Sequence, residues 1–203
     1  MEITKIYTAE SSHRVPGATT TRCAGLHGHS YKFEITLEGT PLNNACMVLD
    51  FSVLKDAIKP FVDSFDHTHM FCEYDEEEYV EFMQKSCDRW ISAPFNWSCE
   101  MMALLICRVC QEILNHTEFS NGEYCEVSSV TVWETATGRC KVTARDVRIF
   151  FQEIWMDKIE YSEGVIQDWP QILQEILLNP ADSRMKYKTR RVDSFMLMPG
   201  INE

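Results

Sequence analysis

Three histidines near the N-terminus have the spacing of a metal site. His27 and His29 flank Gly28 at the start of a segment that alternates like a β-strand. Because residues two apart in a strand point to the same side, both imidazoles can reach one ion, and the glycine allows close approach. His13 follows an earlier candidate strand and could supply a third ligand from an antiparallel neighbour. Three histidines leave one tetrahedral position open, which is typical of catalytic rather than structural zinc.

Acid and base groups accompany these histidines. Taken alone, a His-x-His pair is more often an ordinary surface or core feature. Cys23, four positions before His27, could place a thiol beside the metal, where positive charge favours the thiolate, whereas an isolated cysteine would be structural. Asp66 and His67 follow the first predicted helix and could form a proton relay in which the carboxylate orients the imidazole. The alternative for this pair is a helix C-terminal cap.

Alternating segments predict the strands that position these groups. Residues 30–38 alternate apolar and polar side chains, as a half-buried strand does. Two further strands are predicted over residues 126–134 and 140–149. Glu134 lies on the same predicted face as the apolar Val130 and Val132. A lone acid on an apolar face needs a partner, so we expect Glu134 to bind something.

Helical patterns lie between these strands. Residues 47–51 lead into a helix with apolar residues at helical spacing, and Pro60 is expected to bend or shorten it. A second helix is predicted over residues 98–114, with Ser98 as its N-cap. Together the elements favour an α+β domain whose antiparallel sheet is covered on one face by two helices. The edge strands of such a sheet invite oligomer formation.

The last quarter of the chain has a different pattern. We expect one domain over residues 1–150 and an extension of unassigned role over residues 151–203. Asp168 and Pro170 are expected to be the cap and first position of a short amphipathic helix in that extension. The basic cluster at 184–191 is expected to be a flexible or docking tail rather than a nucleic-acid site.

Composition limits the class of protein. The chain has 203 residues, a formal net charge of -12 and nine cysteines. Its acidity argues against direct binding to a nucleic-acid backbone, since such proteins concentrate positive charge. No stretch has the roughly 20 apolar residues of a membrane span, and the N-terminus lacks the apolar core of a signal peptide. We therefore expect a soluble protein of the cytoplasm, no membrane partner, and free thiols.

An ordered set of motifs resembles a known enzyme family. The set comprises His13, Cys-x3-His-Gly-His-Ser-Tyr at 23–31, Met-Val-Leu-Asp-Phe at 47–51, Asp66-His67, Ser98-Cys99-Glu100 and Trp133-Glu134-Thr135. In order and spacing it resembles the 6-pyruvoyl- and 6-carboxy-tetrahydropterin synthases over roughly residues 3–150. Two departures stand out: Cys46 replaces a usual glycine, and residues 97–100 replace the more common Pro-Thr-Ser/Ala-Glu.

The resemblance implies a fold and a set of roles. The fold is the α+β tunnelling fold, an antiparallel four-stranded sheet with two helices on one face that assembles with other copies into a barrel. Active sites would then lie between the subunits of a homo-oligomer. The implied roles are zinc binding by His13, His27 and His29, acid/base catalysis by Cys23, Asp66 and His67, and substrate binding by Glu134, Thr135 and Glu100.

The resemblance also implies a reaction. Its substrate would be a small molecule, 7,8-dihydroneopterin triphosphate, converted by a zinc-dependent lyase to 6-carboxy-5,6,7,8-tetrahydropterin with release of acetaldehyde and triphosphate, on the route to 7-deazaguanine bases such as queuosine. The Cys-x3-His-Gly-His-Ser spacing and residues 134–138 favour this outcome over a 6-pyruvoyl-tetrahydropterin synthase, which releases triphosphate only. Two other classes stay open: a non-catalytic zinc-binding scaffold, and a zinc hydrolase that needs no thiol beside the metal.

Overall fold

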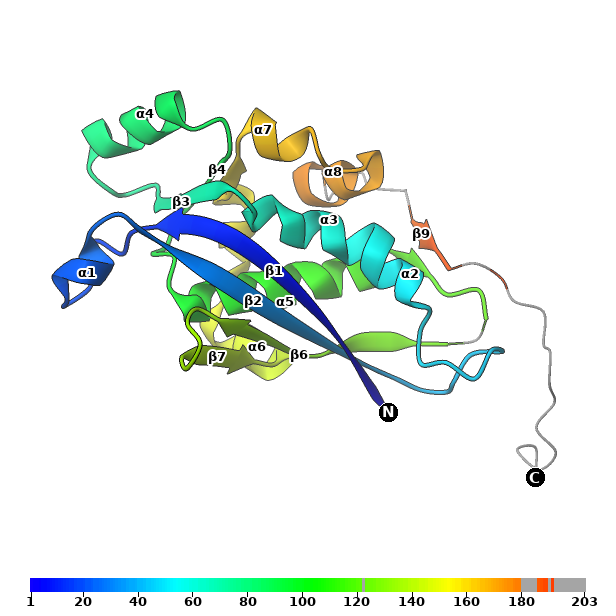
Figure 1. Cartoon of the computed structure of the whole chain (residues 1–203). Coiled ribbons are helices and arrows are strands. Elements are labelled where there is room, and N and C mark those ends of the chain that lie inside the picture. The colour runs from blue at the N-terminus through cyan, green and yellow to red at the C-terminus, as the bar shows by residue number, and fades with distance from the viewer. Residues whose placement is uncertain (122, 180–185, 190, 192–203) are drawn as a thin grey trace.

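The computed structural model describes residues 1–121, 123–179, 186–189 and 191 (Figure 1). The strands are β1 (Glu2–His13), β2 (His27–Gly39), β3 (Thr68–Cys72), β4 (Trp90–Ala93), β5 (Thr117–Glu118), β6 (Cys125–Trp133), β7 (Arg139–Val142), β8 (Glu160–Tyr161) and β9 (Tyr187–Lys188). The α-helices are α1 (Thr21–Ala24), α2 (Phe51–Val53), α3 (Lys59–Val62), α4 (Glu77–Ser86), α5 (Cys99–Asn115), α6 (Ala144–Phe150), α7 (Glu163–Ile166) and α8 (Gln171–Leu178). A π-helical turn, η1 (Leu54–Ile58), and two 3-10 helices, η2 (Asp63–Phe65) and η3 (Glu153–Lys158), complete the set. In this part of the chain a seven-stranded mixed sheet and a small two-stranded sheet of β5 and β9 pack with the helices.

The strands β1 and β2 form the longest ladder of the sheet. They pair antiparallel along their whole length, so that His13 lies opposite His27 and Ser11 lies opposite His29. The alternation of β2 predicted from the sequence is present, because Tyr31, which continues the histidine face, is buried at 1% exposure. The ladder therefore brings the three histidines of two strands to one end of one sheet face.

The helical segment from Phe51 to Phe65 continues past Pro60. Pro60 lies in the first turn of α3, where a missing N–H is tolerated, and the turn before it widens into the π-helical η1. The predicted bend is thus a local widening of the helix. The 3-10 turn η2 ends the segment at Asp66.

The second helix, α5, covers the same core. Its N-cap is Ser98, as predicted, and the Ser98 hydroxyl accepts a hydrogen bond from the Met101 amide at 3.3 Å. In the view of Figure 1, α5 runs behind β1 and β2. Its buried side chains share one hydrophobic core with those of the 51–65 segment and the inner face of the sheet.

The prediction of one strand over residues 140–149 was wrong. Strand β7 ends at Val142, and helix α6 begins after Thr143. Thr143 and Asp146 form a reciprocal capping box, in which each side chain bonds the backbone of the other. This Thr-x-x-Asp signature satisfies helix N–H groups and outweighs the alternation that favoured a strand.

The sheet is wider than the predicted four strands. Its order is β7-β6-β2-β1-β3-β4-β8, and β3 and β4 join in parallel. All five residues of β3 are buried. A strand buried on both faces has no alternation, which is why the sequence pattern did not predict it.

Residues after 150 pack into the same core as the rest. Phe151, Ile159, Val165, Trp169 and Leu173 are buried within the single large hydrophobic cluster. Strand β8 pairs with β4, which adds this segment to the sheet edge.

The smaller predictions can also be placed. The cap of α8 is Pro170, so the helix begins one position later than predicted. Residues 184, 185 and 190 of the basic cluster lie outside the described residues. Within the part of the chain that the structure describes, no helix has the length and apolar character to cross a bilayer.

Candidate metal centre and proton relay

The three histidines form a group that could hold a metal ion. One ring nitrogen from each of His13, His27 and His29 lies within 4.8 Å of the others. The Nε2 atoms of His13 and His27 are 3.1 Å apart. Two ligands at about 2.0 Å from a tetrahedral zinc ion are roughly 3.3 Å apart, so this pair already has the spacing of two ligands of one ion.

Backbone carbonyls fix the tautomers of two rings. Nδ1 of His13 donates to the carbonyl of Trp97 at 2.6 Å, and Nδ1 of His27 donates to the carbonyl of Gly25 at 2.8 Å. Because a carbonyl only accepts, each neutral ring carries its proton on Nδ1, and the two Nε2 lone pairs face each other. The Nε2 atom of His29 is buried without a hydrogen-bond partner. A shared cation would relieve this repulsion and satisfy the orphaned nitrogen, so the donor set fits a metal.

Burial favours the metal-binding form of His13 and His29. Desolvation lowers the pKa of His13 to about 4, although the hydrogen bond to Trp97 raises it in part. The pKa of His29 is also lowered, chiefly by burial and against the charge of Glu134. A neutral imidazole is the metal-binding form, so these rings can bind a cation at neutral pH without first losing a proton.

Glu134 lies beside the histidines. Its Oε1 atom is 3.8 Å from Nε2 of both His13 and His29, and its side chain is 30% exposed. The carboxylate therefore lies next to two of the three histidines and is partly exposed to solvent. In this position Glu134 can accept hydrogen bonds from a bound molecule, as expected for an acid on an apolar strand face.

Asp66 and His67 meet at the end of the first helical segment. Their side chains approach to 3.8 Å between Oδ2 and Nε2. Both are tied to Glu10 of β1, because Oδ1 of Asp66 accepts from the Glu10 amide at 2.9 Å and the His67 amide donates to the Glu10 carbonyl at 2.8 Å. His67 has φ 53°, the left-handed conformation of a residue that follows a helix. Asp66 and His67 therefore end the helix and also lie close enough to interact, so the two interpretations of this pair are compatible.

Three other predicted site residues lie at the surface. Cys23 is exposed on α1, and within the described residues no hydrogen bond or ion pair links its side chain to the histidines or to Asp66 and His67. Glu100 is exposed in the first turn of α5. Thr135 is exposed too, and its hydroxyl accepts from the Gly138 amide at 2.8 Å. A single chain thus does not bring the thiol to the relay.

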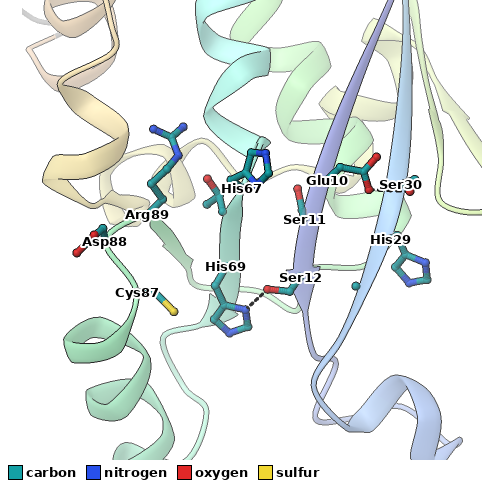
Figure 2. A pocket seen from close by; sticks show the side chains of 12 residues that line it. Glu10, Ser11, Ser12, His29, Ser30, His67, His69, Cys87, Asp88 and Arg89 are labelled. Carbon is teal, nitrogen blue, oxygen red and sulfur yellow. Dashed lines mark hydrogen bonds between the residues drawn. The ribbon is translucent and has the colours of Figure 1, made fainter.

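A pocket beside the cluster contains residues that the sequence did not single out. Figure 2 shows this pocket, lined by His29 and His67 together with His69, Cys87 and Arg89. Nδ1 of His69 lies 2.9 Å from the Ser12 hydroxyl, and its Nε2 lies 2.8 Å from the hydroxyl of Tyr79. The sequence showed His69 two positions after His67, but spacing alone gave it no partner.

Two named proteins are similar to this chain in sequence over most of its length. A protein named 6-carboxy-5,6,7,8-tetrahydropterin synthase from Helicobacter pylori strain J99 is 34% identical over 173 residues, which cover 83% of this chain and 86% of the relative. A protein of the same name from Haemophilus influenzae is 27% identical over 146 residues, or 69% of this chain and 96% of the relative.

A solved structure supports the fold. The crystal structure of an uncharacterized protein from Wolinella succinogenes matches with a TM-score of 0.55 at 19% identity, covering 71% of this chain and 98% of that one. The α+β tunnelling fold expected from the motifs is confirmed as a fold class. The family model described as 6-pyruvoyl tetrahydropterin synthase matches residues 2–145. The chain therefore belongs to the 6-pyruvoyl tetrahydropterin synthase family.

Proposed function

We propose that this protein is a 6-carboxy-5,6,7,8-tetrahydropterin synthase. It converts 7,8-dihydroneopterin triphosphate and one water to 6-carboxy-5,6,7,8-tetrahydropterin, acetaldehyde and triphosphate, as a step toward 7-deazaguanine bases. The H. pylori and H. influenzae relatives are both named 6-carboxy-5,6,7,8-tetrahydropterin synthase, which supports the carboxy product. The observation that carries the proposal is the convergence of three histidine nitrogens beside Glu134.

Zinc is the metal that we propose for this cluster. Imidazole nitrogens suit zinc, and His13, His27 and His29 would provide three ligands while the fourth position stays open to substrate. Bound zinc would supply Lewis-acid polarisation of a substrate side-chain hydroxyl.

The protein's own groups then divide the proton transfers and the binding. Cys23 removes or returns a proton on the substrate side chain, and His67, oriented by Asp66, serves the other end of the transfer. Glu134 accepts two N–H bonds from the aminopyrimidinone ring, with Thr135 and Glu100 as further binding groups. Glu134 lies 3.8 Å from two of the histidines, which supports binding of that ring beside the metal cluster.

A second copy of the chain completes the site in this proposal. Strand β1 pairs with β3 only over Ser11–His13, and Glu10 bonds Asp66 and His67, so the described residues leave the stretch 2–9 open on that side. Strand β7 ends the sheet on the opposite side. Pairing between such edges closes a barrel and would bring Cys23 of one subunit toward Asp66 and His67 of another. The nine cysteines are all free, which fits work in a reducing cytoplasm.

A product assay tests the proposal. Zinc-loaded protein is incubated with 7,8-dihydroneopterin triphosphate, and the products are identified by mass spectrometry, with acetaldehyde measured in parallel. We expect 6-carboxy-tetrahydropterin and acetaldehyde in equal amounts. A 6-pyruvoyl product without acetaldehyde would replace the proposal by the pyruvoyl reaction, and unchanged substrate would favour a scaffold.

Replacement of the thiol distinguishes the synthase from a hydrolase. Cys23→Ala removes the acid/base group, so we expect kcat to fall about 10²- to 10⁴-fold with the zinc content unchanged. Cys46→Ala is the matched control, because Cys46 is also exposed and lies outside the site. Full turnover by Cys23→Ala would exclude this role for the thiol.

A further inference from the structure

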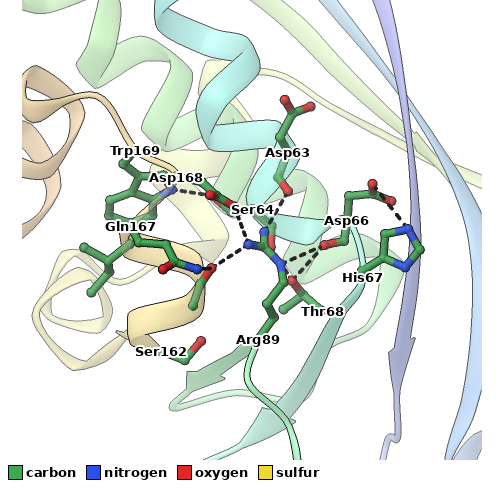
Figure 3. Close-up of polar contacts among 12 residues, drawn as sticks. Asp63, Ser64, Asp66, His67, Thr68, Arg89, Ser162, Gln167, Asp168 and Trp169 are labelled. Carbon is green, nitrogen blue, oxygen red and sulfur yellow. Dashed lines mark hydrogen bonds and ion pairs between the residues drawn. The ribbon is translucent and has the colours of Figure 1, made fainter.

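We propose that Arg89 is a positioning residue for the Asp66–His67 pair and that the segment after residue 150 holds Arg89 in place. The inference deepens the proposed function and rests on it, since it assigns a task to Arg89 in the same proton relay. Three sets of contacts carry it: those of Arg89 with the helix end, those of Arg89 with α7 and its C-terminal flank, and those of Trp169 with the same helix (Figure 3).

The first set caps the helix that carries the relay. A helix ends with carbonyl groups that have no partner within it. Arg89 donates from Nε to the carbonyl of Asp66 at 3.1 Å and from Nη2 to the carbonyl of Asp63 at 3.2 Å. A guanidinium at this end satisfies the carbonyls and complements the negative end of the helix dipole. The capped backbone is the segment that leads directly into His67.

The second set ties Arg89 to the C-terminal segment. Its Nη1 atom donates to the carbonyl of Gly164 and to Oδ2 of Asp168, both at 2.6 Å. The helix α7 approaches so closely that a Cβ on Gly164 would overlap the carbonyl oxygen of Asp88. Arg89 therefore donates four hydrogen bonds, two to each side of its guanidinium group. The single ammonium group of a lysine cannot reproduce this planar arrangement.

The third set braces the helix independently of Arg89. The indole N–H of Trp169 donates to the hydroxyl of Ser64 at 2.6 Å, and Trp169 is 4% exposed. The segment is anchored in turn by the pairing of β8 with β4 and, just after β8, by the Ser162 amide, which donates to the Trp90 carbonyl at 3.0 Å. The residues that contact Arg89 and Ser64 from this segment, Gly164, Asp168 and Trp169, thus lie beyond the family match at 2–145.

The geometry at His67 explains why such support is needed. A histidine at φ 53° is strained, and it keeps this conformation only where the surroundings hold it. Glu10 holds the turn from β1, because its amide donates to the Asp66 carboxylate and its carbonyl accepts from the His67 amide. Arg89 holds it from the other side, on the carbonyl that precedes His67. Loss of that contact frees the turn, and a misplacement of about 1 Å can cost roughly 10²-fold in rate.

The test combines amide exchange with kinetics. In Arg89→Ala we expect hydrogen exchange at the His67 amide to accelerate at least tenfold relative to wild type, with kcat about 10- to 100-fold lower, KM within threefold and zinc content unchanged. Asp168→Asn serves as the milder variant should Arg89→Ala not fold, because Asp168 is 62% exposed. It should accelerate the same amide several-fold with a smaller fall in kcat.

Arg108→Ala is the matched control. Arg108 is exposed to a similar degree, 23% against 21%, and its Nε donates to Glu153 at 3.0 Å, which ties the C-terminal segment to α5. Among the described residues it makes no hydrogen bond or ion pair with Asp66 or His67. It should leave His67 exchange and kcat within twofold of wild type.

The outcomes separate this inference from the proposed function. If the His67 amide exchanges as in wild type in both Arg89→Ala and Asp168→Asn, the inference is overturned. It is also overturned if exchange accelerates while kcat stays unchanged. If the wild-type protein turns over no dihydroneopterin triphosphate, the proposed function fails, while exchange still decides whether Arg89 holds the Asp66–His67 turn.

Discussion

At the scale of single residues, the strand period was enough to predict the histidine cluster. His27 and His29 share a strand face by spacing, and the ladder brings His13 opposite His27. The carbonyls of Trp97 and Gly25 that fix the tautomers were not predictable, since every residue has a carbonyl and only the fold selects which one meets a ring. Cys23 stays a prediction, because its partners would belong to another copy of the chain.

His69 gives a prediction for the pH dependence of stability. Burial, reinforced by the charge of Arg14, lowers its pKa from 6.5 to about 4, against the hydrogen bond with Ser12. Between these values the unfolded chain binds a proton that the folded protein does not, so folding stability falls as pH drops from 6.5 to 4.

The variant that checks this is His69→Gln in metal-free protein. Denaturant unfolding from pH 7 to pH 4 should show that the variant loses up to about 3 kcal/mol less than wild type across this window. Comparison of slopes removes the uniform cost of the substitution itself. Identical slopes for the two proteins would mean that His69 titrates alike in the folded and unfolded chains.

At the scale of elements, long amphipathic segments were predictable and short buried ones were not. The strand at 30–38 and the helix at 98–114 appear as β2 and α5, because their periodicity records which face is buried. Strands β3 and β4 are short and mostly buried, so periodicity gave no signal. The error at 140–149 came from weighing alternation above the capping signal.

The loop before the first helical segment contains a second strained residue. Cys46 has φ 61°, at the position where the resemblance anticipates glycine. Asn43 closes this loop, because its Oδ1 atom accepts hydrogen bonds from the amides of Ala45 and Met47 at 2.9 and 3.0 Å. A left-handed conformation costs a residue with a Cβ about 1–2 kcal/mol in the folded state. Glycine avoids this strain, but it loses more conformational entropy on folding, which offsets part of the gain.

Cys46→Gly is therefore expected to stabilise the protein. The free energy of unfolding should rise by up to about 1 kcal/mol in denaturant titrations. Cys46→Ala is the control, because it also removes the exposed thiol but keeps the strained Cβ, and it should give no gain. Equal stability of the two variants would contradict the assignment of strain to this residue.

At the scale of the whole molecule, the open edge of β1 predicts assembly. The N–H and C=O of Glu10 point away from β2, toward Asp66 and His67. Residues at even positions along the strand repeat this direction, so the N–H of Ile6 faces the open edge. Ile6 is 53% exposed, which fits a surface awaiting a partner strand.

Ile6→Pro removes one outward donor while sparing the ladder with β2. Light scattering coupled to size exclusion should give a multiple of the 23.6 kDa chain mass for wild type and a smaller species for the variant. Ile6→Ala keeps the N–H and should remain assembled. A wild-type protein of single-chain mass would refute the proposal that the site forms between subunits.

The central claim is a zinc ion held by three histidines with one position open, and X-ray absorption at the zinc edge tests it most directly. The predicted spectrum has three imidazole nitrogens at about 2.0 Å and one light-atom ligand that changes when substrate is added. In His29→Ala, bound zinc should fall well below one per chain. A sulfur ligand, or a fourth ligand from Glu134 that persists with substrate present, would contradict the account.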